Sequence, residues 1–92
     1  MMKMYKIIRI TDLNGDDKPS AAHRLGRVMD IDPNTIPIEK NMFMPCVELD
    51  KSIITTPVAK WQYTDGGLQI ITRNSIYSFE VVEDYDEYTE NM

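Results

Sequence analysis

The segment IITTPVAKWQYTDGGLQIITRNSIYSFEVV, residues 53–82, decides the fold of this chain. It contains apolar runs at 58–63, 68–72 and 76–82 that are rich in β-branched and aromatic residues, which favour strands. The residues Asp-Gly-Gly that follow the first run are typical of a hairpin turn, and the asparagine that follows the second tolerates positive φ in a tight connection. Two linked hairpins predict an antiparallel meander.

Outside that segment, the sequence predicts further strands and almost no helix. Residues 3–11 alternate between the two faces of a half-buried strand, and residues 27–31 form another strand. The run 42–49 contains Pro45, which lacks a backbone donor and indicates an edge strand or a bulge. One short helical turn is expected at 20–24, between a capping serine and a terminating glycine.

These strands lie eight to twelve residues apart with no long helix between them, which predicts an all-β fold: a small antiparallel meander, barrel-like or strongly bent. Residues 1–82 form this single domain, and residues 83–92 form an acidic tail. A type I turn is expected at 32–34. Residues 53–63 are interpreted as one strand bent at Pro57.

The net charge of −5 comes entirely from the tail. Residues 1–82 carry ten basic and ten acidic side chains, whereas residues 83–92 carry five acidic and no basic ones. A neutral body lacks the basic face that a nucleic-acid backbone requires, so direct DNA or RNA binding is not expected. No run approaches the about 18 apolar residues of a membrane span, and no signal peptide is recognisable. A cytoplasmic protein without a membrane partner is therefore expected.

Catalytic and metal-binding motifs are missing from the sequence. It contains no glycine-rich phosphate loop, serine elbow, paired cysteines or histidine-metal spacing. Cys46 is expected to pack as a small hydrophobic residue; the alternatives are a nucleophilic pair with His23 or an acid pair built from carboxylates. We therefore expect a protein that is not an enzyme and that needs no metal or cofactor.

A first candidate ligand surface joins the bend at Pro57 to the connection after residue 72, because an antiparallel meander can bring these segments together. Its predicted members are Thr55, Thr56, Arg73, Asn74, Ser75 and Tyr77. Hydroxyls, an amide and a guanidinium suit recognition of phosphate or ribose. The alternative is structural: the threonines favour strands, and the asparagine and serine serve the turn.

A second candidate surface is the local positive patch of His23, Arg24 and Arg27 beside Gly26, which could close over an anion. An ordinary solvated loop is the alternative. Trp61 is expected mainly in the core. The alternative is that one of two apolar groups, Trp61 with Tyr63 or Phe43 with Met42 and Met44, stacks on a base or lines an oligomer contact.

We also expect a homo-oligomer, because a short chain with many large apolar side chains often completes its core by self-association. Association would also cover exposed strand edges.

Three short motifs, at 26–30 (GRVMD), 54–58 (ITTPV) and 72–77 (TRNSIY), resemble small phage and prophage β proteins. The resemblance extends over residues 26–82. It implies an accessory protein that counters bacterial antiviral defence without catalysis, by sequestering a nucleotide immune signal as a homo-oligomer. Arg73, with Arg24 or Arg27, would contact the phosphates of a cyclic or ADP-ribose-type signal, and an aromatic residue would stack on its base. The neutral body departs from the basic pocket that such a ligand favours.

Two other functions remain open. One is a protein-binding inhibitor, similar to anti-CRISPR proteins, that presents residues 83–92 to the basic surface of a host defence nuclease. The other is a structural or assembly module without a ligand.

Overall fold

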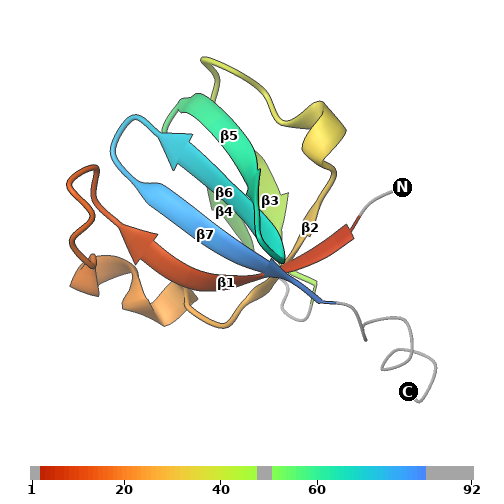
Figure 1. The fold of residues 1–92 in the computed structure, drawn as a ribbon, viewed down its shortest axis with the longest axis horizontal. Coiled ribbons are helices and arrows are strands. Elements are labelled where there is room, and N and C mark those ends of the chain that lie inside the picture. Colours follow the sequence, from red (N-terminus) through yellow and green to blue (C-terminus); the bar gives the residue numbers. More distant parts are fainter. Residues whose placement is uncertain (1–2, 48–50, 83–92) are drawn as a thin grey trace.

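The structure is a computed structural model that describes residues 3–47 and 51–82. It is all-β, as predicted, and its main feature is a curled antiparallel five-stranded sheet (Figure 1). The elements are β1 (Lys3–Thr11), the 3-10 helix η1 (Pro19–Arg24), β2 (Val28–Ile31), the 3-10 helix η2 (Pro33–Thr35), β3 (Phe43–Pro45), β4 (Ser52–Ile54), β5 (Val58–Thr64), β6 (Gly67–Thr72) and β7 (Ile76–Val81).

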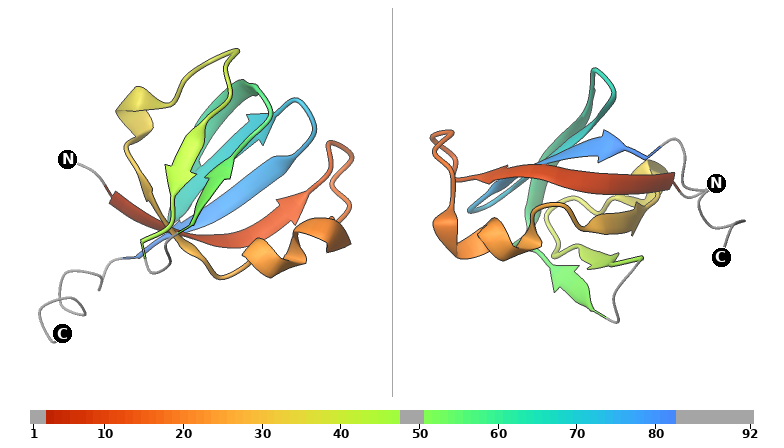
Figure 2. Two further views of the ribbon diagram at one scale, coloured as in Figure 1. Left: turned by 180° about the vertical axis from the view of Figure 1, so that it is seen from behind. Right: turned by 90° about the horizontal axis from the view of Figure 1, so that it is seen from below.

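The large sheet has the strand order β2-β1-β7-β6-β5, so the predicted meander β5-β6-β7 is present. The N-terminal strand β1 lies between β2 and β7 and pairs antiparallel with both. Strands β3 and β4 form a separate two-stranded sheet, which an isolated bridge between Met29 and Cys46 joins to β2. Figure 2 shows this small sheet lying across the interior from β6 and β7. The two sheets together enclose the core.

Several elements differ in detail from the sequence predictions. Residues 53–63 do not form one bent strand: β4 and β5 belong to different sheets, and Pro57, which cannot donate to a ladder, lies between them. The run at 42–49 forms a strand only at Phe43–Pro45, and part of that run lies outside the described residues. The predicted type I turn at 32–34 is the 3-10 helix η2, a difference of little consequence because the two conformations have similar backbone angles.

The core lies on the concave face of the large sheet. Tyr5, Ile7, Leu68, Ile70 and Phe79 are almost fully buried there. The rings of the tyrosine and the phenylalanine meet edge to face, with centroids 6.3 Å apart. Burying each of these side chains contributes about 1.5–3 kcal/mol relative to exposure.

Strands β2, β3 and β4 cover the other side of the core with Met29, Met44 and Ile53. Cys46 is a buried, free thiol in the same cluster, so the prediction that it packs as a small hydrophobic residue is confirmed.

Two β-bulges curl the sheet. The register of β1 against β7 shifts between Ile7 and Arg9, and that of β5 against β6 shifts between Val58 and Lys60. An extra residue on one strand bends it and increases its twist. The curvature lets a five-stranded sheet of short strands wrap around a single core.

Substitution of Gly67 tests the close approach between β6 and β7. A methyl group there would overlap the backbone carbonyl of Phe79, so Gly67→Ala should cost about 3 kcal/mol or more of the free energy of unfolding. Gly15 is the matched control: it has a φ of +91° and no atom near the added methyl, so Gly15→Ala should cost only about 1 kcal/mol. Urea unfolding measures both losses, and equal losses would contradict this packing.

Candidate functional site

The structure brings the bend at Pro57 against the connection between β6 and β7, as the sequence analysis predicted. The backbone N–H of Arg73 donates to the Pro57 carbonyl at 2.9 Å. Next to this contact, the Thr56 hydroxyl donates to Thr72 Oγ1 at 2.9 Å. Segments 16 residues apart in sequence are therefore held together by both backbone and side-chain bonds.

Thr72, which the sequence analysis did not place at the site, is the hub of this contact. Its hydroxyl donates to the Ser75 carbonyl and accepts from the Ser75 N–H, both at 3.1 Å, in addition to the bond from Thr56. The side chain is almost fully buried. A threonine that ends a strand just before a three-residue connection is the signal that could have identified this role.

Thr55 is buried and its hydroxyl is used within the protein. It accepts from the Met42 N–H at 3.1 Å and donates to the Thr56 carbonyl at 2.7 Å. The side chain of Asn41 donates to the Thr55 carbonyl at 2.7 Å. These bonds hold the end of the small sheet against the start of β5, which is the structural alternative that the sequence left open for this residue.

Lys18 approaches the same connection from the loop before η1. Its ammonium donates to Ser75 Oγ at 2.8 Å, across 57 residues of sequence. Nothing local in the sequence indicates this contact, because it depends on the pairing of β1 with β7. We call the group of Lys18, Thr56, Arg73, Asn74 and Ser75 the turn site.

The two predicted surfaces meet at a single pair of residues. Arg24 Nη1 on η1 donates to the Tyr77 hydroxyl on β7 at 3.1 Å. The Tyr77 ring is buried and stacks against Phe79 with centroids 6.3 Å apart. It therefore offers no open face to a base, and its hydroxyl orients the guanidinium instead.

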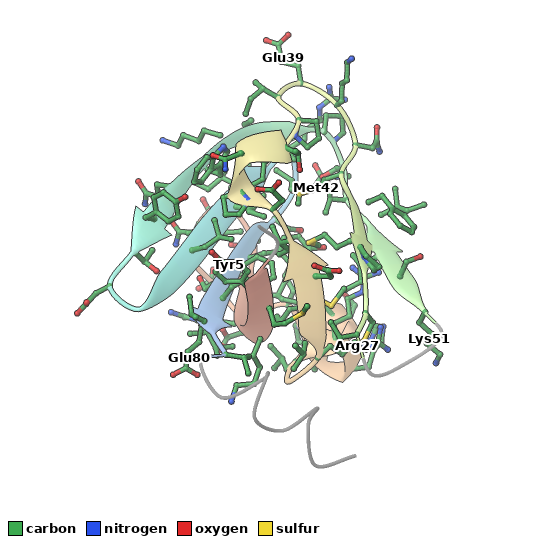
Figure 3. All side chains as sticks on the ribbon, turned by 90° about the vertical axis from the view of Figure 1, so that its right-hand side faces the viewer. Tyr5, Arg27, Glu39, Met42, Lys51 and Glu80 are labelled. Carbon is green, nitrogen blue, oxygen red and sulfur yellow. The ribbon has the colours of Figure 1, made fainter. Side chains whose placement is uncertain are left out.

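Arg27 does not join the turn site. Figure 3 places Arg27 beside Lys51, at the end of the molecule opposite Glu39. The turn site lies at the Glu39 end, because the N–H of Glu39 donates to the carbonyl of Val58, the residue after Pro57. The backbone of Arg27 bonds to Ile7 and Arg24, and no hydrogen bond or ion pair of the described residues joins Arg27 to the turn site.

The charges around the turn site favour an anion. The carboxylate of Asp17 pairs with Arg9 at 3.0 Å, and the carboxylate of Asp12 accepts two backbone N–H groups of its own loop. Within the part of the chain that the structure describes, neither Lys18 nor Arg73 forms an ion pair. Arg73 and Asn74 are exposed, so two cationic groups and an amide flank the ordered turn.

Residues 3–47 and 51–82 contain neither a metal-ligand cluster nor a candidate membrane span. In these ranges no three histidine, cysteine, aspartate or glutamate side chains are grouped closely enough to hold a metal ion. No helix in these ranges combines the length and the apolar character needed to cross a membrane.

The turn site depends on Thr72, and this dependence can be tested. Thr72→Val keeps the shape of the side chain but leaves the buried N–H of Ser75 and the Thr56 hydroxyl without their partner. We expect a loss of about 1–3 kcal/mol in the free energy of unfolding, measured with urea. Thr64→Val, at an exposed strand position, should change it by less than about 0.5 kcal/mol. Similar effects of the two changes would show that the network contributes nothing.

Comparison with protein families, with curated proteins and with solved structures finds no match for this chain.

Proposed function

We propose that this protein is a non-enzymatic binding protein that sequesters a phosphate-bearing nucleotide signal, with the turn site as its anion contact. In the setting that the phage-type motifs suggest, removal of the signal would silence a bacterial antiviral defence. The single observation that carries the proposal is that the Lys18 ammonium bonds to the turn that contains Arg73, and that neither side chain has an ion-pair partner in the described part of the chain.

The contacts at this turn suit a phosphate group. An exposed guanidinium can bind two phosphate oxygens at once, and an ammonium adds a compact charge beside it. Lys18 already donates to Ser75 Oγ at 2.8 Å, so its ammonium is held at the turn before a ligand arrives. A preordered contact loses less conformational entropy on binding.

Arg24 is a further positive group for the same ligand. Its guanidinium is held by the hydroxyl of Tyr77, which is the second residue of β7 and follows Ser75 by two residues. A guanidinium has five N–H donors, so most remain available for an extended ligand with more than one phosphate. This favours a diphosphate or a cyclic dinucleotide over inorganic phosphate.

Calorimetric titration of the full chain with ADP-ribose and with a cyclic dinucleotide tests the proposal. Arg73→Ala should weaken binding of the preferred compound by about tenfold or more, because a charge-assisted bidentate contact is lost. Lys6→Ala is the matched control: it removes an exposed cation that pairs with Glu80, away from the turn site, and should change affinity less than about twofold.

Two outcomes would contradict the proposal. One is no binding of either compound tighter than about 1 mM, and the other is equal effects of Arg73→Ala and Lys6→Ala.

A truncated chain that ends at Val82 distinguishes a function of the tail from a function of the turn site. Sequestration predicts that removal of residues 83–92, which lie outside the described residues, leaves the affinity unchanged, whereas inhibition of a basic nuclease through the tail predicts loss of inhibition.

A further inference from the structure

Strand β5 is the last strand of the large sheet, and its outer edge is only partly covered (Figure 1). Val58, at its start, exchanges backbone hydrogen bonds with the 39–40 segment, donating to Lys40 O at 2.9 Å and accepting from Glu39 N at 2.7 Å. Beyond Val58 every residue of β5 is exposed or partly exposed. An open edge of this length is a template for pairing with another strand.

The hydrogen-bonding direction along β5 follows from its partner β6. The Thr72 N–H bonds to Ser75 on the β7 side, whereas the Arg73 N–H bonds to Pro57 on the β5 side. Backbone N–H and C=O groups of successive residues point to opposite edges of a strand, so those of Gly67, Gln69 and Ile71 point toward β5. Their partners on β5 are Thr64, Gln62 and Lys60.

Trp61 and Tyr63, between those partners, therefore direct their backbone N–H and C=O groups away from the sheet. Within the described ranges, neither residue has a backbone bond to another segment on that outer side. The edge thus presents the unpaired backbone N–H and C=O groups of Trp61 and Tyr63, with Gln62 between them.

The same two residues carry large aromatic side chains. Trp61 and Tyr63 pack edge to face with centroids 5.1 Å apart, opposite the buried Ile70 and Leu68 of β6. Tyr63 is nevertheless 63% exposed. Tyr63 also lies near Tyr5 of the core. Burial raises the pKa of the Tyr5 hydroxyl above its ordinary value, and the charge of the nearby Tyr63 raises this pKa further. The apolar layer of the sheet therefore continues to the open edge.

We propose that this edge pairs antiparallel with the β5 edge of a second copy of the chain, so that the two curled sheets form one continuous sheet. With Gln62 on the twofold axis, Trp61 of each copy lies opposite Tyr63 of the other. These are the two residues whose backbone groups face outward, so this register satisfies them, and a shift by one residue does not.

Side-chain chemistry favours a second copy as the occupant. The register gathers the aromatic pairs of both copies on one face, where cross-strand aromatic contacts stabilise sheets. On the other face, Lys60 of each copy lies beside Thr64 and near Asp65 of the other, so opposite charges approach each other. A twofold contact also uses the β5 edge of both copies, so no third copy can add at this edge.

A cysteine at the twofold axis tests this register in the full chain. Directly opposite residues of a non-hydrogen-bonded antiparallel pair have Cα atoms about 4.5 Å apart, within the range for a disulfide. Gln62→Cys should therefore give mostly disulfide-linked dimer under mild oxidation. Gln69→Cys, on the neighbouring strand, should not, and the wild type with its buried Cys46 provides the blank. Equal crosslinking of the two variants, or none for Gln62→Cys, would overturn the register.

Light scattering after size-exclusion chromatography tests the pairing itself without a new thiol. The wild type should be a dimer at about 100 μM. Tyr63→Pro removes an outward donor but none of the bonds to β6, so it should weaken dimerisation about tenfold or more while circular dichroism still shows a folded chain. A monomeric wild type would overturn the proposal whether or not the protein binds nucleotides, so the two proposals fail separately.

Discussion

The pairing of β1 with β7 is the interaction on which the remaining structure depends. It joins the first described strand to the last and leaves β1 flanked by strands on both sides. Without it, β1 and β2 would be detached from the meander β5-β6-β7, and part of the apolar face of the meander would be uncovered. Tyr5 and Ile7 supply the apolar surface that this pairing buries. The contact closes a loop of most of the chain, at an entropic cost that only core burial offsets.

The candidate site follows from that pairing, because β1 ends next to the start of β7. The loop after β1 carries Lys18 to the Ser75 hydroxyl, and η1 then carries Arg24 to the Tyr77 hydroxyl. Inside the turn, Thr72 satisfies both backbone groups of Ser75. The buried hydroxyls thus have a structural role, and the exposed side chains beside them are the groups presented to solvent. A rigid support under a few charged groups is what anion recognition requires.

Strand edges are the second constraint on so small a fold. The outer edge of β2 is covered in part by the bridge from Met29 to Cys46 and by the bond from Val47 N to Val28 O at 2.8 Å. The start of β5 is covered by the 39–40 segment. Further along β5 the edge carries aromatic side chains that its own core does not enclose. A chain of 92 residues buries a modest share of its surface, so pairing such an edge adds useful stability.

The sequence alone predicted what local chemistry controls. The Asp65-Gly66 turn, with Gly66 at a φ of +83°, sets the β5-β6 hairpin, and the short polar connection after Thr72 sets the next. From these two hairpins the meeting of Pro57 with the 73–75 connection followed directly, since neighbouring antiparallel strands bring their ends together.

Only the tertiary structure decided which distant segments join. Tertiary structure set the position of β1 between β2 and β7 and the assignment of β4 and β5 to different sheets. It also set the contacts of Lys18 with Ser75 and of Arg24 with Tyr77. The exposure of Tyr63, whose sequence context matches that of buried strand residues, depends on it as well. The physical reason is the range of the interactions. Turn residues impose backbone angles on their neighbours in sequence, whereas strand order and edge exposure depend on burial of the whole apolar face by segments from all parts of the chain.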